Sequence, residues 1–340
     1  MSGSKAQSKL RVLAITRKPH SASFEQRIQN HIELLGEQGV DVTVRIYPKA
    51  IREQAAVLAE GRGYDLVWWH RHLLPRWRLH QLRKSAKKIV FDFDDPVGFS
   101  TRTHGRSFMR SRRFAALLSA CDAAMVGSRY LEEQATPHCN NIHRIPMAIS
   151  LPDVRSRPDA QKEGVELLWL GSASTQKYLE ELRPALERIG ELRSDVRMRL
   201  VAHKPMSFGA LKVGFVQWSP ETQEQALQEC DIGLCPMPDT PWTRGKCPYK
   251  VLQYMANGMP WVGSAVGENL VTAGAAGSGD QRGVCATEVD EWVQAVIALA
   301  DNPQRQQLGE NCRDYIAQHH ERKKVAEQIA AAFRSVVAIP

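Results

Sequence analysis

The sequence predicts an α/β protein of two domains, each built on a parallel, doubly wound sheet. Short apolar runs alternate with helical patterns along the chain, which is typical of parallel sheets. Two segments, 9–16 and 165–172, are also alike: each is an apolar run that ends in a polar turn, as in the first strand of such a domain. A chain of 340 residues is long enough for two domains with separate cores.

The remaining elements follow in order. In the first half the pattern predicts a helix near 24–37 and strands at 41–47, 64–69, 88–93 and 122–128. Residues 151–163 hold two prolines and lack periodicity, so we place the interdomain linker there. In the second half we expect a helix over 174–189 and strands at 196–202, 213–218, 231–235, 260–264 and 283–286. Thr287 and Asp290 resemble a capping box, and the chain ends in a helical pattern.

Composition and cysteine usage are those of a soluble cytosolic protein. Hydrophobic residues make up 43% and charged residues 24% of the chain. The polar start is no secretory signal, and no apolar run approaches the about 20 residues of a membrane span. Seven cysteines without a C-x-x-C pair indicate reduced thiols. His70 with His72, and His319 with His320, lack a third ligand at a metal-binding spacing.

The net charge of +8 is concentrated in the first half. Residues 1–155 hold 25 Lys and Arg against 14 Asp and Glu, and 12 basic residues lie within 71–113. This excess indicates either a solvated basic face or a surface that binds an anionic partner, such as a phosphorylated acceptor or an acidic membrane. No recognisable nucleic-acid module accompanies the charge, so we expect no nucleic acid.

The segment LGSAST, 170–175, leads from a strand through a glycine into a helix. The N–H groups at such a helix start can hold a phosphate, with hydroxyls from Ser172 and Ser174 and a cation from Lys177. The alternative is an ordinary helix cap that uses Ser174.

The segment 243–264 places cations before a helix. Pro248 suits the first turn of that helix and Asn257-Gly258 its end, so Arg244, Lys246 and Lys250 crowd the positive end of the helix dipole. A bound diphosphate would make this arrangement favourable. The alternative is that the side chains extend into water and bind no ligand.

Three carboxylates end the strand of VFDFDDP, 90–96. Asp94 and Asp95 are expected at the carboxyl end of the strand, facing the ligand cleft of an α/β protein. Asp92 and Asp94 also fit the D-x-D pattern of haloacid-dehalogenase-like phosphatases, but Pro96 occupies the Thr or Val position of that motif. A third interpretation is that the aspartates cap the following turn.

Taken in order, several segments resemble family-4 retaining glycosyltransferases of the GT-B fold. They are FDFDDPVG, CDAAMVGSRYLEE, WLGSASTQKYLEEL, FVQWSPETQEQALQECDIGLCPMPD and KCPYKVLQYMANGMPWVGSAVGEN. The resemblance implies a Rossmann-like acceptor domain over 1–155 and a Rossmann-like nucleotide-sugar domain over 164–320 across a central cleft. It also implies a last helix, 321–340, that crosses back to the first domain.

The resemblance further assigns roles to particular residues. It implies that Asp94 or Asp95 faces the transferred sugar, and we expect Asp94, Asp95 and Lys246 to carry the chemistry. From the basic charge of the first domain we expect Arg27, Arg102 and Arg106 on the acceptor side. The residues expected at the donor are Gly171, Ser172, Ser174, Lys177, Trp218, Arg244, Lys250, Gln253, Gly267 and Asn269. No metal is expected, because such enzymes usually work without one.

The chain departs from the family pattern at the donor site. The common E-x7-E pair falls on Gly245 and Gln253, and the arginine that often follows the strand glycine is Ser172. One coherent interpretation is that Arg244, Lys246 and Lys250 meet the phosphate charge instead.

The resulting hypothesis is a cytosolic, metal-independent, retaining, hexosyltransferase-like enzyme of polysaccharide biosynthesis. It would move a sugar from a UDP- or GDP-sugar to a glycan, lipid-linked, phosphorylated or other glycoconjugate acceptor, with peripheral contact to an anionic membrane at its inner face. The alternatives are a non-catalytic nucleotide-sugar-binding or partner protein, favoured by the missing glutamates, and a nucleotide-sugar epimerase.

Overall fold

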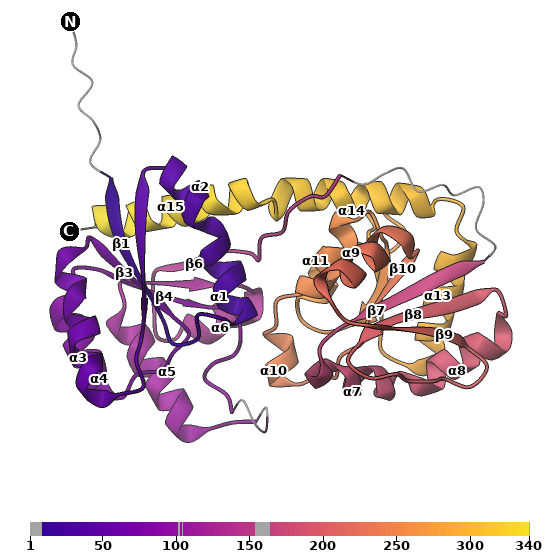
Figure 1. Ribbon diagram of the computed structural model, residues 1–340, viewed down its shortest axis with the longest axis horizontal. Coiled ribbons are helices and arrows are strands. Elements are labelled where there is room, and N and C mark those ends of the chain that lie inside the picture. Colours follow the sequence, from indigo (N-terminus) through magenta and orange to yellow (C-terminus); the bar gives the residue numbers. More distant parts are fainter. Residues whose placement is uncertain (1–8, 101–102, 104, 154–163, 340) are drawn as a thin grey trace, which may run out of the picture. The chain divides into compact units, whose positions relative to one another are not determined.

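The computed structural model describes residues 9–100, 103, 105–153 and 164–339 (Figure 1). These residues form two compact units. The first unit runs to Ala148 and also contains Thr240–Cys247 and the chain from His320 on, whereas the second contains Ile149–Asp239 and Pro248–His319. The segment 240–247, which the sequence placed in the second domain, therefore packs in the first unit.

The first unit is a six-stranded parallel sheet in the order β2-β1-β3-β4-β5-β6. The predicted strands are confirmed as β1 (Leu10–Thr16), β2 (Val40–Ile46), β3 (Leu66–His70), β4 (Ile89–Phe93) and β5 (Ala123–Val126). The sheet also has β6 (Ile142–Arg144), which is three residues long and only partly buried. Its polar sequence, IHR, is why the hydrophobic pattern missed it.

Helices cover both faces of this sheet. Alternate residues of each strand point to opposite faces, so each face has its own apolar core. One face is covered by α1 (Ala22–Arg27), α2 (Ile32–Glu37) and the C-terminal α15 (Arg322–Ala338). The other is covered by α3 (Ile51–Ala59), α4 (Arg76–Ser85), α5 (Phe108–Ala120) and α6 (Arg129–Ala135).

The helix predicted near 24–37 is interrupted in the structure. It ends as α1 at Ile28, whose φ of −125° and ψ of −62° are not helical, and resumes through a 3₁₀ turn, η1 (Gln29–His31), into α2. A β-branched residue has a lower helix propensity, and here the side chain of Ile28 is fully buried, so packing overrides the helical pattern.

The second unit is also a six-stranded parallel sheet, ordered β12-β11-β10-β7-β8-β9. All six strands were predicted, and they are β7 (Val165–Leu170), β8 (Val196–Ala202), β9 (Lys212–Gln217), β10 (Ile232–Cys235), β11 (Trp261–Ser264) and β12 (Gly283–Ala286). The helices are α7 (Ala173–Glu181), α8 (Arg183–Leu192), α9 (Pro220–Glu229), α11 (Tyr249–Ala256), α12 (Glu268–Thr272), α13 (Val289–Asp301) and α14 (Arg305–His319).

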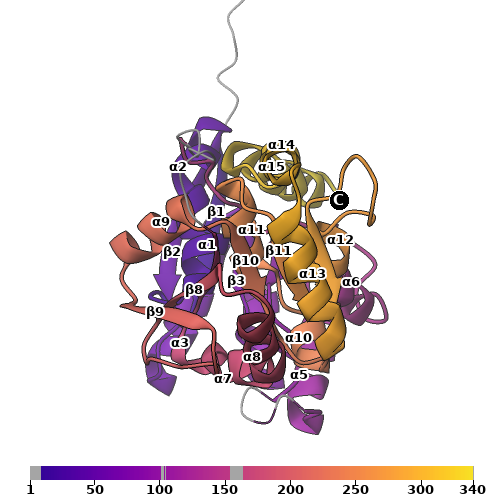
Figure 2. The same ribbon diagram turned by 90° about the vertical axis from the view of Figure 1, so that its right-hand side faces the viewer.

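Two helix predictions in this unit need correction. The helix expected over 174–189 is two helices that meet at Leu182, because Pro184 lies in the first turn of α8 and has no N–H to continue α7. The capping box before α13 pairs Glu288 with Glu291, one residue later than the predicted pair Thr287 and Asp290. Figure 2 shows α8 and α13 side by side, where they share one core against the sheet.

On the other face of this sheet, α11 is anchored by a buried tyrosine. The hydroxyl of Tyr254 donates to the carbonyl oxygens of Leu234 at 3.0 Å and Leu168 at 3.3 Å, which lie on neighbouring strands. A Cβ on Gly233 would lie 2.3 Å from the Tyr254 ring, so β10 needs glycine there. As predicted, α11 ends at Asn257, and Gly258 follows with a left-handed φ of 66°.

A buried ion pair joins α1 to β4 in the first unit. Arg27 donates to Asp92 through its Nε, at 3.1 Å, and through a terminal nitrogen, at 2.6 Å. Its other terminal nitrogen donates to the carbonyl of Ile145 at 2.6 Å, and Trp68 Nε1 donates to the second oxygen of Asp92 at 3.0 Å. Both charged side chains are almost wholly excluded from solvent, so each depends on the other.

None of the helices within the described ranges is long and apolar enough to span a bilayer.

Arg27→Ala should lower the free energy of unfolding by about 3–5 kcal/mol, because it leaves the Asp92 carboxylate buried without its cation. Urea denaturation measures this difference. Arg45→Ala is the matched control, since it removes an exposed ion pair with Glu60 and should cost no more than about 1 kcal/mol. Equal losses in the two variants would show that the buried pair has no special role.

Candidate functional site

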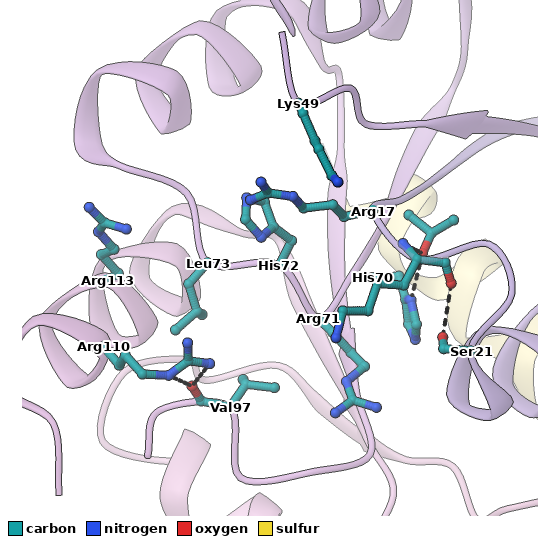
Figure 3. Close-up of a pocket in the computed structure, with 12 residues that line it drawn as sticks. Arg17, Ser21, Lys49, His70, Arg71, His72, Leu73, Val97, Arg110 and Arg113 are labelled. Carbon is teal, nitrogen blue, oxygen red and sulfur yellow. Dashed lines mark hydrogen bonds between the residues drawn. The ribbon is translucent and has the colours of Figure 1, made fainter. Parts of the chain in front are cut away.

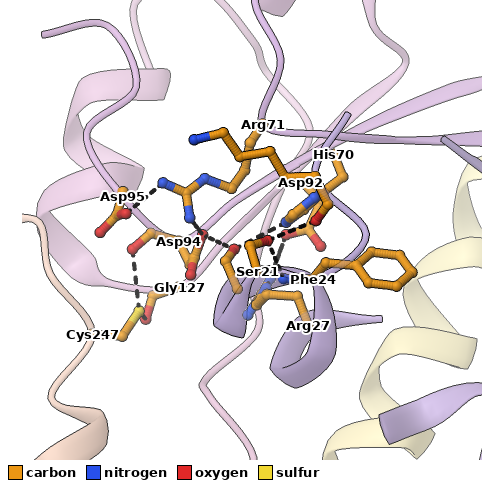
Figure 4. A network of polar contacts seen from close by, with 12 residues as sticks. Ser21, Phe24, Arg27, His70, Arg71, Asp92, Asp94, Asp95, Gly127 and Cys247 are labelled. Carbon is orange, nitrogen blue, oxygen red and sulfur yellow. Dashed lines mark hydrogen bonds and ion pairs between the residues drawn. The ribbon is translucent and has the colours of Figure 1, made fainter. Parts of the chain in front are cut away.

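The carboxyl edge of the first unit's sheet holds a compact polar network (Figure 4). Asp94 and Asp95 follow β4, and Arg71 follows the neighbouring β3. The Arg71 guanidinium lies 3.1 Å from a carboxylate oxygen of Asp94 and 2.5 Å from one of Asp95. Arg71 has a left-handed backbone with φ of 57°, which is unfavourable for a residue with a side chain. One cation thus holds both predicted catalytic carboxylates.

A chain of hydrogen bonds continues from Asp94 into the interior. The Ser23 hydroxyl donates to Asp94 at 2.6 Å and also lies 3.0 Å from His70 Nε2. Because Ser23 has one proton and gives it to the carboxylate, His70 must donate through Nε2. His70 Nδ1 then accepts from the hydroxyl of Thr16, 3.1 Å away. Burial lowers the pKa of His70 to about 3, so the ring is neutral at pH 7.

The pKa values of the two adjacent carboxyls, Asp94 and Asp95, are shifted in opposite directions. Burial raises the pKa of Asp95, and the neighbouring charge of Asp94 adds to that shift. Burial also acts to raise the pKa of Asp94, but Arg71 and the Ser23 hydroxyl outweigh it and hold that pKa below its usual value. Asp94 is therefore the more acidic of the pair, an asymmetry typical of sites where two carboxyls take different roles.

The segment that precedes α11 is anchored beside these aspartates. The Cys247 thiol donates to the carbonyl of Gly127 at 3.2 Å and is 3.6 Å from that of Asp94. A Cβ on Gly127 would lie 2.4 Å from the Cys247 sulfur, so the close approach requires glycine. Lys246 is near enough to Asp95 to act on its pKa, in the lowering direction. Lys246 and both predicted catalytic aspartates are thus brought together in one unit.

Gly245 explains one departure from the family pattern. It is buried, its carbonyl accepts from Ser128 at 3.3 Å, and an added Cβ would lie 2.4 Å from the ring of Pro96 and 3.1 Å from that of Tyr130. A glutamate does not fit at this position without a shift of the backbone.

The prediction that Arg244 lies at the positive end of the dipole of α11 needs a correction. Arg244 ends a separate short helix, α10 (Pro241–Arg244), where a cation is favourable to the helix dipole. There Arg244 and Arg106 line a cavity of about 520 Å³ in the first unit, together with Pro96, Gly98, Phe99, Ser111, Phe114, Tyr130, Leu131, Gln134, His138 and Pro241.

Arg27 and Asp92 also need correction. Arg27 was expected on the acceptor side, but its guanidinium is buried and fully engaged with Asp92 and Ile145. Asp92 is equally buried in that pair, so it cannot serve as the nucleophile of a phosphatase. Arg102 lies outside the described residues.

In the second unit, Lys250 and the β7–α7 turn lie at the same edge of the sheet. The Lys250 ammonium is 4.3 Å from the ring centre of Trp169, near the end of β7, which is a cation–π contact. Gly171 follows that strand, and a Cβ there would lie 2.8 Å from both Thr175 and Trp169. The N-cap of α7 is Ser172 rather than Ser174, whose side chain is outside what the structure describes.

The other predicted donor residues differ in accessibility. Trp218 follows β9, is 40% exposed, and donates to Gln223 at 3.1 Å. Lys177 is exposed on α7, and Gln253 is partly exposed on α11. Gly267 starts α12 with φ of 56° and ψ of −132°, a conformation that glycine alone adopts readily.

Asn269 is a further correction. It is fully buried and donates through Nδ2 to the carbonyl of Ser264 at 3.0 Å, so it shapes the loop after β11 instead of reaching a ligand. A cavity of about 300 Å³ at this edge is lined by Tyr178, Glu181, Leu182, Pro236, Met237, Pro238, Asp239, Ser264, Ala265, Val266, Ala286, Thr287, Val289 and Trp292. None of these described residues is one of those predicted to contact the donor.

Sequence reasoning missed Thr16, Ser23, His70 and Arg71 as members of the site. A usable indication existed for two of them, because His70 and Arg71 directly follow the strand predicted at 64–69, which neighbours the aspartate-bearing strand. In the described part of the chain, no group of three or more His, Cys, Asp or Glu residues is arranged to hold a metal ion.

His70→Gln should make stability less sensitive to acid. An unfolded histidine takes up a proton near about pH 6.5, whereas folded His70 resists protonation down to about pH 3, so acidification through this window favours unfolding. Removing the ring should reduce the slope of unfolding free energy against pH by up to about 1.4 kcal/mol per unit.

Chemical denaturation at several pH values between about 6 and 4 measures that slope. His80→Gln, which changes an exposed histidine of α4, should leave the slope unchanged. A slope that His70→Gln does not alter would contradict a neutral, buried imidazole.

Comparisons with known proteins agree with this architecture. Residues 150–302 match the family model described as Glycosyl transferases group 1. No curated protein sequence matches the chain.

Solved structures of low sequence identity share the fold over nearly the whole chain. Sucrose-phosphate synthase from Thermosynechococcus elongatus is 18% identical, with a TM-score of 0.73 over 98% of this chain and 100% of its own. HepE from Anabaena, in complex with UDP-glucose, is 13% identical, with a TM-score of 0.68 over 96% and 100%. The apo form of the lipopolysaccharide outer core galactosyltransferase WaaB is 12% identical, with a TM-score of 0.68 over 96% and 99%. The chain therefore has the GT-B fold that its motifs predicted, and its residues 150–302 match the glycosyl transferases group 1 family.

Proposed function

We propose that this protein is a glycosyltransferase that moves a sugar from a UDP- or GDP-linked donor to a glycan or other glycoconjugate acceptor, with retention and without a metal. The observation that carries the proposal is the edge of the second unit where Lys250 lies beside the β7–α7 turn. There Lys250 is held over Trp169, and β7 leads into the Gly171–Ser172 turn at the start of α7. A nine-residue helix offers N–H groups without intrahelical acceptors at its start, which suit a diphosphate.

The structural neighbours support the nature of the donor. HepE has been solved in complex with UDP, with UDP-glucose, and with UDP and glucose. By analogy, Trp218 offers an exposed aromatic face to the base, and Lys250 offers positive charge to the phosphates.

The proposed reaction breaks the bond between the anomeric carbon and the phosphate oxygen of the donor. The acceptor oxygen forms its bond on the same face, and its proton passes to the leaving phosphate oxygen. Lys250 stabilises the charge that develops on the leaving group. Asp94, kept ionised by Arg71 and Ser23, accepts a hydrogen bond from a hydroxyl of the transferred sugar and orients it.

A non-catalytic protein that binds nucleotide sugars is the second candidate. The observation that favours it is the loss of both family glutamates. Gly245, which follows α10 in the first unit, has no room for a glutamate, and Gln253 on α11 stands in place of the other. Hydrolysis of the donor in the absence of acceptor separates the two candidates.

Lys250→Ala should weaken binding of UDP or GDP by roughly 1–3 kcal/mol, because it removes a charge-assisted contact to a phosphate. Isothermal titration calorimetry measures the affinity. The control is Lys212→Ala, which changes an exposed lysine at the end of β9 that is farther from Trp218. This variant should bind the nucleotide as wild type does. Unchanged affinity in Lys250→Ala would refute the phosphate contact.

Asp94→Asn should lower the rate of UDP-sugar hydrolysis roughly 10- to 100-fold while UDP affinity stays as in wild type. In the proposed reaction the carboxylate contacts the sugar and not the nucleotide, so its loss should affect turnover and spare nucleotide affinity. Hydrolysis is followed by release of UDP across a panel of UDP-sugars, with the exposed Asp41→Asn as control. Absence of hydrolysis above background in wild type would favour the non-catalytic candidate.

A further inference from the structure

A second feature of the first unit is a cavity of about 620 Å³ beside the aspartate network (Figure 3). Its walls come from residues that follow β1, β2, β3 and β4 and from α5. Parallel strands end at the same edge of a sheet, so the topology brings these separate segments together. The lining residues are Thr16, Arg17, Lys18, Ser21, Lys49, His70, Arg71, His72, Leu73, Val97, Arg110 and Arg113.

Six of these side chains are arginine or lysine, and none of the described lining residues is acidic. Arg71 is balanced by Asp94 and Asp95. Among the described residues, no carboxylate forms an ion pair with the other five, Arg17, Lys18, Lys49, Arg110 and Arg113. Elsewhere in this unit arginines do find carboxylates, as in the pair of Arg83 with Asp122 at 2.5 Å. Five cations without an ion pair to a described carboxylate thus line one cavity.

Several of the cations are held in position. Arg110 donates twice to the carbonyl of Val97, at 2.8 and 3.0 Å, and Arg17 contacts His72 Nε2 at 3.2 Å. Figure 3 shows Arg110 and Arg113 on one side of His72 and Lys49 on the other. The charges thus surround the cavity, and they do not form a single stripe on one exposed helix.

The electrostatics of the cavity match this geometry. Burial lowers the pKa of His72 to about 4, with further lowering by Arg17, Arg113 and Arg110, so the ring adds no charge at pH 7. Burial also lowers the pKa of Arg110, and the nearby Arg113 and Arg71 add to the effect. Like charges that destabilise one another are relieved when an anion binds between them.

We propose that this cavity binds the phosphate groups of the sugar acceptor. The proposal rests on the proposed function for the statement that the ligand is the acceptor. Five unbalanced cations exceed what one phosphate needs, and the volume is that of a small-molecule site, so the ligand carries more than one phosphate oxyanion or a phosphate on a larger body. The phosphate could belong to a soluble glycan phosphate or to a lipid headgroup.

The test titrates inorganic pyrophosphate into the full chain with excess UDP present, so that the proposed donor site is occupied. Lys49→Gln with Arg113→Gln should weaken pyrophosphate binding at least about tenfold and reduce its dependence on salt. The matched control is Arg62→Gln with Lys84→Gln, which removes the same charge from exposed positions that precede β3 and β4 at the opposite edge. The control should bind as wild type does.

Two results would overturn the proposal: equal weakening in both double variants, or no pyrophosphate binding by wild type at millimolar concentration. Thermal unfolding of each variant confirms that it is folded. UDP affinity is measured in parallel and separates the two proposals. Pyrophosphate binding that is weakened only in Lys49→Gln with Arg113→Gln, together with no UDP binding, would support the anion site and contradict the proposed function. UDP binding without such pyrophosphate binding would support the proposed function and contradict the anion site.

A vesicle experiment distinguishes the two sources of phosphate. Sedimentation with phosphatidylcholine vesicles that contain phosphatidylglycerol measures binding to lipid headgroups. Vesicle binding lost only in Lys49→Gln with Arg113→Gln supports a lipid-borne phosphate, and pyrophosphate binding without vesicle binding supports a soluble one. Vesicle binding lost equally in the control variant would show a general effect of surface charge and count against the cavity.

Discussion

The buried pair of Arg27 and Asp92 sets the geometry on which the first unit's site depends. It fixes α1 against β4, and each of these elements carries one member of the site: Ser23 on α1 and Asp94 just after β4. The same guanidinium reaches the carbonyl of Ile145 beyond β6. A buried pair contributes little net stability but is costly to break, so its main effect is to exclude other registers of α1. The 2.6 Å contact between Ser23 and Asp94 follows from that placement.

The strands could be predicted because of what parallel sheets require. A strand covered by helices on both faces has no polar side, so it appears as a continuous apolar run such as LVWWH in β3, all five residues of which are buried. Helix interruptions were harder. At Leu182 the following Pro184 was an available indication, whereas the break at Ile28 depends on tertiary packing that no local pattern reveals.

The site was only partly predictable, since charge in a sequence does not reveal burial or partners. Asp94 and Asp95 were found because a strand end at the ligand edge is a positional indication. Arg27 was wrongly predicted on the acceptor side because the sequence does not distinguish a buried structural arginine from an exposed arginine that binds a ligand. Arg71 holds both aspartates through a left-handed backbone that would ordinarily call for glycine, so its conformation had no sequence mark. The packing of 240–247 in the first unit also joins segments over 100 residues apart, such as Ser128 and Gly245.

The excess of basic residues in the first half can be explained once the cations that pair with a carboxylate are separated from those that do not. Some form ion pairs within the fold, as Arg27 does with Asp92 and Arg83 does with Asp122. The cations at the cavity that lack a carboxylate partner among the described residues repel one another. They therefore raise the free energy of the unliganded unit, and the shorter the distances between them, the larger this effect is. A bound polyanion removes that cost as well as forming new contacts, and it stabilises the folded unit by RT ln(1 + [L]/Kd). Solvation alone gives like charges no reason to lie close together, because they repel one another. Their concentration at one strand edge is therefore better explained by a ligand than by solvation.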